Sequence, residues 1–214
     1  MDTATSWAGP IDGPASLRER KKAATRLALH RAVAELSAAK GLDAVTVEAI
    51  ADHANVSRRT FSNYFPNKEE ALLYGERMRY DALLREIRGR PARETPWQAL
   101  CRSAHVLVDV LGDMDPVWLA QMRLVHRHPS LAAHQMAMQS TVERELVTEI
   151  VARVAHPGAQ PVSDDERALR ARVLAGVFLA ALRAAVAVWI DRQERLDLVA
   201  TVDAALRCAA ERLR

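Results

Sequence analysis

Two polar side chains, four residues apart, have the chemistry to read the edges of DNA bases. Arg59 and Asn63 lie in the stretch NVSRRTFSNYF, residues 55–65, and share one face of a helix at 100° per residue. A planar guanidinium can bridge two acceptors of guanine, and a carboxamide can pair with adenine, in a major groove that admits one helix. Phe61 and Phe65 lie on the opposite face, where they would anchor the helix to its own domain. The alternative for the two polar residues is an ordinary solvated face, so the flanking sequence must decide.

The sequence around this stretch has helix–turn–helix spacing. Thr46 is placed to cap one short helix and Ser57 to cap the next. Ala51 is small where two helices must cross, and Val56 would fill the turn between them. A longer helix over residues 16–40 precedes both, so the first third of the chain predicts a three-helix unit.

Basic residues upstream support contact with nucleic acid. The segment RERKKAATR, residues 18–26, carries five basic residues against one acid. At the start of the first helix, Arg18, Lys21 and Lys22 suit contacts with the phosphates of flanking DNA. Lys68, next to a helix N-terminus, is similarly placed for a phosphate. The alternative for the cluster is a solubilising basic end of the helix.

The remaining elements are also predicted to be helices. The chain has only 8 glycines in 214 residues, its prolines fall at boundaries, and no stretch shows sustained alternation. Further helices are expected over residues 68–88, with Asn67 as cap, and over 96–111, 115 onwards, 130–154, 164–192 and 198–213. We therefore expect an all-α protein of about nine helices, with an N-terminal three-helix helix–turn–helix domain followed by a C-terminal helical bundle.

Composition and charge exclude several classes of protein. The net charge of +3 is small, so a basic binding surface must be a local patch. Cys101 and Cys208 lie too far apart in helix-like sequence for a disulfide framework or a zinc site, which favours a reducing cytoplasm. The N-terminus lacks the features of a signal peptide. The apolar run over residues 173–190 carries Arg183 in its middle, so we expect a helix buried in protein and no membrane partner.

The histidines do not indicate catalysis. His126 and His128 are two residues apart, diverge around a helix and make a poor metal pair. His105 and Asp109, four apart, could pair, but no nucleophile motif or phosphate-binding glycine loop accompanies them. We expect no enzymatic activity, no metal site and no cofactor.

The run from Gly41 to Leu73, GLDAVTVEAIADHANVSRRTFSNYFPNKEEALL, closely resembles the DNA-binding domain of TetR-type repressors. The resemblance implies an all-helical homodimer with a three-helix N-terminal DNA-binding domain and a larger ligand-binding C-terminal domain. The positions that match family residues in contact with DNA are Thr46, Ser57, Arg58, Arg59, Thr60, Asn63, Tyr64 and Lys68. Many members have tyrosine where this chain has Ser62, so a common phosphate contact is lost or shifted here.

Residues 121–154 resemble the C-terminal domain of the mycofactocin-system regulator subgroup, which implies long acyl-CoA-like effectors. The expected organisation is a flexible tail (1–15), a helix–turn–helix DNA-binding domain (16–66), a connecting helix (67–90) and an effector-binding and dimerisation domain (91–214). We expect a ligand-responsive repressor that binds a palindromic operator on double-stranded DNA as a dimer and is released by a small apolar effector. A DNA-binding dimer without small-molecule control, or an activator, remains open.

A ligand pocket in a helical bundle is mostly apolar, with a few polar groups. The large apolar side chains expected to line it are Trp97, Met114, Trp118, Met122, Met136 and Phe178. Arg123 and Arg127 could meet the phosphates of a CoA-like effector. For each of these apolar residues the alternative is plain core packing, and for the two arginines it is a solvated surface.

The last two helices are expected to form the homodimer interface. One apolar stripe runs along the final helix, and the helix before it has small residues that allow close approach. These residues are Leu198, Val202, Leu206, Ala209 and Leu213, with Ala180, Ala181, Ala184 and Ala185. The alternative is burial of the same residues within one subunit.

Overall fold

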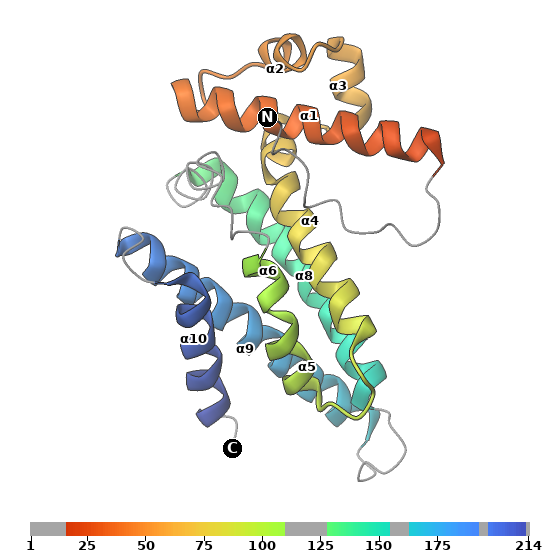
Figure 1. Cartoon of the computed structure of the whole chain (residues 1–214), viewed down its shortest axis with the longest axis vertical. Helices are drawn as coiled ribbons and strands as arrows, with labels where there is room; N and C mark the ends of the chain where they lie inside the picture. The colour runs from red at the N-terminus through yellow and green to blue at the C-terminus, as the bar shows by residue number, and fades with distance from the viewer. Residues whose placement is uncertain (1–15, 110–127, 155–162, 193–196, 213–214) are drawn as a thin grey trace, which may run out of the picture. The chain divides into compact units, whose positions relative to one another are not determined.

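The computed structural model describes residues 16–109, 128–154, 163–192 and 197–212, and every element in these ranges is a helix (Figure 1). The helices are α1 (Leu17–Lys40), α2 (Val47–His53), α3 (Arg58–Tyr64), α4 (Lys68–Gly89), α5 (Pro96–Ser103), α6 (His105–Asp109), α8 (Pro129–Val154), α9 (Asp164–Asp191) and α10 (Leu198–Arg212). The all-α prediction is confirmed. The single helix expected over residues 96–111 is instead divided at Ala104, and the helix expected from residue 115 begins outside the described residues.

The chain forms two compact units. The first contains residues 1–78 and 113–136, and the second contains residues 79–112 and 137–214. The boundary falls inside α4 and inside α8, so each of these helices contributes residues to both units.

Polar side chains start the helices of the first unit where the sequence predicts them. The side-chain oxygens of Thr46, Ser57 and Asn67 accept hydrogen bonds from the backbone N–H three residues further on, at 3.2, 3.0 and 2.7 Å. These bonds satisfy N–H groups that have no partner within their own helix. Gly41 ends α1 with a φ of 79°, and Asn55 has a φ of 53° in the turn between α2 and α3. Positive φ favours glycine and asparagine, so both turns suit their residues.

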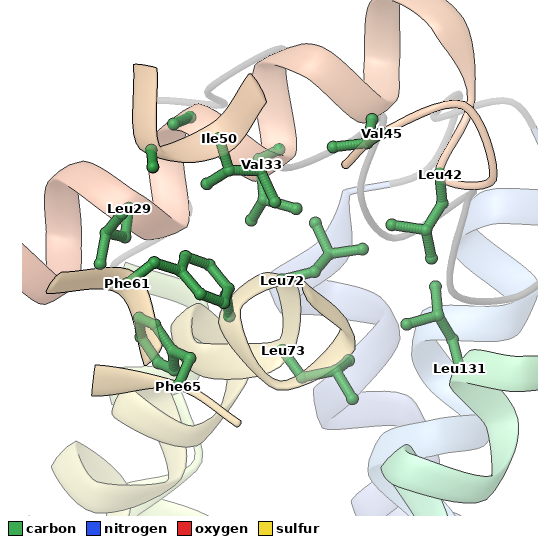
Figure 2. Packing of buried hydrophobic residues seen from close by; sticks show 14 residues of the cluster. Leu29, Val33, Leu42, Val45, Ile50, Phe61, Phe65, Leu72, Leu73 and Leu131 are labelled. Atoms are coloured by element: carbon green, nitrogen blue, oxygen red, sulfur yellow. The ribbon is translucent and has the colours of Figure 1, made fainter. Parts of the chain in front are cut away.

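The core of the first unit joins α1, α2, α3 and the start of α4 (Figure 2). Leu29 and Val33 of α1 belong to one cluster with Ile50 of α2, Phe61 of α3 and Leu72 of α4. All five side chains are almost fully buried. Burying a side chain of this size contributes about 1.5–3 kcal/mol, so this cluster fixes the position of α3 within the unit.

The first turns of α8 also belong to this core. Leu131 is fully buried in the same cluster as Leu42, which follows α1 (Figure 2). Nearby, Nε2 of His128 lies 3.1 Å from Oδ1 of Asp43. The three-helix unit is therefore completed by a segment that lies more than sixty residues further along the chain.

α1 and α4 approach closely at Gly75. The Nδ1–H of His30 on α1 donates to the carbonyl oxygen of Ala71 at 3.0 Å, and the imidazole packs edge-on against the ring of Tyr74 with centroids 6.2 Å apart. A Cβ atom at position 75 would lie 2.6 Å from Nε2 of His30. Glycine at this position therefore leaves the space that the imidazole occupies.

In the second unit, a buried carboxylate holds the turn between α4 and α5. Glu94 accepts hydrogen bonds from Nε of Arg90 at 2.8 Å and from Nη1 of Arg102 at 2.5 Å. The bonds from Arg90 are the largest influence and, with those from Arg102, they outweigh burial and lower the pKa of Glu94 from its usual value near 4.5 to about 2. Arg153 of α8 donates to the carbonyl oxygens of Ile87 and Arg90 at the end of α4.

α9 and α10 pack along one another within the second unit (Figure 1). Leu198, Val202 and Leu206 of α10 are buried within the chain. This part of the stripe expected at the dimer interface is therefore core, Ala209 is half-buried, and Leu213 lies outside the described residues.

Candidate nucleic-acid interface

α3 divides into a buried aromatic face and an exposed polar face. Phe61 and Phe65 are 1% and 5% exposed, and their ring centroids lie 6.1 Å apart. Arg59 and Asn63 are exposed. The two faces predicted from the 100° spacing are confirmed, because Phe61 and Phe65 lie in the core (Figure 2), whereas Arg59 and Asn63 are exposed.

The start of α1 and the polar face of α3 line one open groove. Its lining residues are Leu17, Arg18, Glu19, Lys21 and Lys22 from α1, with Thr60, Asn63 and Tyr64 from α3. The guanidinium carbon of Arg26, two turns into α1, lies 5.9 Å from the centroid of the Tyr64 ring. The two segments lie about forty residues apart in sequence. On one surface they place the cations of Arg18, Lys21 and Lys22 beside the side-chain amide of Asn63.

The other predicted contact residues lie outside this groove. Thr46 and Ser57 are exposed, and their hydroxyl oxygens cap α2 and α3. The hydroxyl of Ser57 also hydrogen-bonds that of Thr60 at 2.8 Å. Both hydroxyls lie at helix N-termini, where backbone N–H groups already favour an anion such as phosphate.

Lys68 has an internal role that the sequence does not reveal. Its Nζ donates to the carbonyl oxygen of Leu42 at 2.8 Å and to that of Val45 at 2.9 Å. The ammonium therefore holds the loop between α1 and α2 with two of its three N–H groups. One N–H remains for the predicted phosphate contact.

Arg58 is paired across the turn. Its Nη1 lies 2.8 Å from Oε1 of Glu48, in the first turn of α2. The sequence gives no signal for this role of Glu48, because the two residues are ten positions apart on different helices and only the fold places them together.

The apolar residues predicted to line a ligand pocket are only partly brought together. Trp97 of α5 is half-buried and Phe178 of α9 is fully buried, and their rings pack edge to face with centroids 6.5 Å apart. Met136 belongs to the first compact unit and is 71% exposed, which is unlike the lining of an apolar pocket. The predicted residues Met114, Trp118 and Met122, with Arg123 and Arg127, lie outside the described residues.

α9 keeps an exposed apolar face. Leu169, Val173 and Val188 are 62%, 46% and 46% exposed, and Ala180 and Ala184 are exposed between them. By length and composition α9 could cross a membrane, with a mean hydropathy of 2.2 over its most apolar 18 residues, and 39% of that window is buried in the chain. One such helix is weak evidence for a membrane span, and exposed Arg172 and Arg183 lie on the same side of α9.

Metal binding and thiol chemistry have little support in the described part of the chain. Those residues contain no group of three or more histidine, cysteine, aspartate or glutamate side chains arranged to hold a metal ion. Burial, with a smaller effect of Asp203, raises the pKa of the Cys101 thiol to about 11. A thiol with so high a pKa is a poor nucleophile at neutral pH.

Comparison with known families and proteins identifies the family of this chain. Residues 29–74 match the family model of bacterial regulatory proteins of the tetR family, and residues 94–214 match the model of the MftR C-terminal domain. The HTH-type transcriptional regulator TcmR of Streptomyces glaucescens is 33% identical over 219 residues, which cover 100% of this chain and 92% of TcmR.

Solved structures show the same fold. FadR of Thermus thermophilus, a TetR-family repressor in complex with lauroyl-CoA, is 28% identical with a TM-score of 0.52, covering 87% of this chain and 93% of FadR. FadR of Bacillus subtilis in complex with stearoyl-CoA is 18% identical with a TM-score of 0.57, covering 86% of this chain and 96% of FadR. The chain belongs to the TetR family of transcriptional regulators, which are transcription factors that bind DNA as dimers and are not enzymes.

Proposed function

We propose that this protein is a repressor that binds a palindromic operator as a dimer and releases it when a small apolar effector of the acyl-CoA class binds. The observation that carries the DNA-binding part is the shared groove of α1 and α3. Its lysines and arginine provide sequence-independent attraction to phosphates, and the adjacent polar face of α3 provides groups that distinguish bases. An operator-binding protein of this kind works in the cytoplasm.

The DNA-contacting residues fall into two roles. Arg59 and Asn63 read base edges in the major groove, since both are exposed on α3 opposite its buried aromatic face. Phosphate contacts come from Arg18, Lys21, Lys22, Thr46, Ser57, Thr60, Tyr64 and the remaining N–H of Lys68. Arg58, also predicted to contact DNA, is exposed and paired with Glu48.

The effector class is supported by the relatives and by the aromatic residues of the second unit. The Thermus thermophilus FadR binds lauroyl-CoA and is 28% identical to this chain. Trp97 and Phe178 form an aromatic pair between α5 and α9, which suits contact with an alkyl chain. We assign effector binding and dimerisation to residues 91–214.

The dimer interface involves the exposed faces of the last two helices. On α9, Ala180 and Ala184 lie between exposed larger apolar residues, so a second copy could approach closely along this face. Two such helices from each subunit would form a four-helix bundle. In the dimer, two α3 helices must lie about 34–36 Å apart to enter successive major grooves on one side of the duplex. An effector that binds more tightly to a dimer with a different distance between its two α3 helices lowers the affinity for DNA. The loss of DNA-binding free energy equals the difference between the effector's binding free energies for the two states.

The test begins with an operator recovered from a library of random duplexes by repeated selection on the purified protein. A palindrome should be enriched, and the double variant Arg59→Ala, Asn63→Ala should lose discrimination between the palindrome and a scrambled duplex. Band-shift titrations with lauroyl-CoA, stearoyl-CoA and CoA without an acyl chain then test the effector class. Release by the acyl-CoAs alone is expected. If saturating acyl-CoA leaves DNA binding unchanged, this effector class is wrong, and a dimer without small-molecule control becomes the better description.

A further inference from the structure

Two neighbouring arginines at the start of α3 differ in their partners. Arg58 forms an ion pair with Glu48 of α2, with Nη1 and Oε1 2.8 Å apart. Arg59, one residue on, has no hydrogen-bond or ion-pair partner within the ranges that the structure describes. The side chains of Arg58 and Glu48 are 72% and 54% exposed, so the pair lies in solvent and DNA phosphates can compete for the guanidinium.

We propose that Glu48 is a specificity-determining residue, which lowers binding to non-operator DNA by holding Arg58 away from phosphates. Non-operator DNA attracts the protein almost entirely through its phosphates. An unpaired guanidinium at the exposed end of the recognition helix would add to that attraction on every sequence. Glu48 neutralises this charge as long as the ion pair is intact.

The same pair acts as a positioning contact on the operator. It joins the first turn of α2 to the first residue of α3, across a turn whose conformation is set by Asn55. A fixed turn keeps the exposed face of α3 in one orientation, so Arg59 and Asn63 meet base edges together. Removal of Glu48 should therefore raise affinity for non-operator DNA more than affinity for the operator.

The chain offers a matched control. Glu35 of α1 pairs with His53 of α2 at 2.8 Å, and its side chain is 48% exposed, close to the value for Glu48. Glu35→Gln and Glu48→Gln change the net charge of the same compact unit equally. Any difference between the two variants is then due to position, since the contribution of net charge is the same.

The experiment measures the dissociation constants of the full-length dimer for the selected operator and for a scrambled duplex of the same composition, across a series of salt concentrations. For Glu48→Gln we expect about three- to ten-fold tighter binding to the scrambled duplex and a smaller change on the operator. The slope of log K against log salt concentration should steepen by about 0.9 for each additional phosphate that the protein neutralises. Glu35→Gln should change both affinities by less than about two-fold. Equal effects of the two variants, or an unchanged ratio between duplexes for Glu48→Gln, would overturn the proposal.

The variant Arg58→Ala provides a second test that needs no operator. In this background Glu48→Gln should no longer tighten binding to the scrambled duplex, because no arginine remains to be released. Persistence of the effect would show that Glu48 does not act through Arg58 and would reject the proposal. The inference rests on the DNA-binding part of the proposed function, and the two can fail separately. If no palindrome is enriched, operator recognition fails, whereas the scrambled-duplex measurements still decide the role of Glu48.

Discussion

The substitution Gly75→Ala should destabilise the protein, although alanine is normally favoured over glycine inside a helix. Gly75 lies in α4, where a Cβ atom would come within 2.6 Å of Nε2 and 2.9 Å of Cε1 of His30. Because real Cβ atoms do not approach other atoms this closely, the imidazole must move. It would then give up its hydrogen bond to Ala71 and its edge-on contact with Tyr74.

The expected size follows from opposing contributions. Alanine gains about 1 kcal/mol over glycine in a helix interior. Overpacking of a filled site costs about 1–3 kcal/mol, which includes the loss of a hydrogen bond worth about 0.5–1.5 kcal/mol. The net effect of Gly75→Ala is a loss of about 1 kcal/mol. In a His30→Ala background the clash is absent, so the same substitution should stabilise by about 1 kcal/mol.

The four proteins of this double-mutant cycle are unfolded in urea at one fixed protein concentration, and unfolding is followed by far-ultraviolet circular dichroism. The measurement shows whether the effect of Gly75→Ala on the free energy of unfolding changes sign when His30 is removed. The fixed concentration matters because the stability of a dimer depends on it. Gly89→Ala is the control, since a Cβ atom at that end of α4 meets nothing within 4 Å. It should be neutral or slightly stabilising in both backgrounds. If Gly75→Ala stabilises the protein equally with and without His30, the close packing of α1 on α4 at this point is refuted.

Three further predictions concern single residues. Asn55→Gly should change the free energy of unfolding by less than about 0.5 kcal/mol, whereas Asn55→Val should cost about 1–2 kcal/mol, because a β-branched residue is strained at a φ of 53°; chemical denaturation distinguishes the two. Lys68→Met should cost about 1–3 kcal/mol in the same assay, since two backbone carbonyl oxygens lose their donor. The pKa of Glu94 is lowered by folding, so its carboxylate contributes stability that is complete above about pH 4.5 and is lost as the pH falls toward about 2. Glu94→Gln should therefore lower the melting temperature at neutral pH, and the melting temperature of the variant should fall less steeply in acid than that of the wild type. Thermal unfolding measured across this pH range tests this, and equal slopes for the two proteins would contradict it.

Much of the DNA-binding unit could be predicted because its determinants are local. The caps Thr46 and Ser57, and the positive-φ glycine at position 41, act within four residues of themselves. The buried and exposed faces of α3 follow from a spacing of four residues, which a helix converts directly into direction. These features need no knowledge of the rest of the chain.

The contacts that could not be predicted join residues far apart in sequence. Nothing near Lys68 indicates that its ammonium would bind the carbonyl oxygens before α2, since a lysine beside a helix N-terminus also suits a phosphate. The ion pair of Glu48 with Arg58 depends on the angle between two helices. An apolar stripe cannot by itself distinguish subunit core from dimer interface, which is why the pattern indicates an interface at Val202 although this residue is buried within the chain.

The burial of Leu131 beside Leu42 has a consequence for any attempt to dissect or recombine this protein. The compact unit that contains α1, α2 and α3 is not encoded by one continuous stretch of the gene. A fragment that stops after α4 would lack this leucine and leave part of the apolar cluster around Leu42 exposed to water. A chimera that joins this DNA-binding unit to an unrelated effector domain should therefore retain residues 128–136. Otherwise the new domain must supply an apolar side chain that covers the site of Leu131.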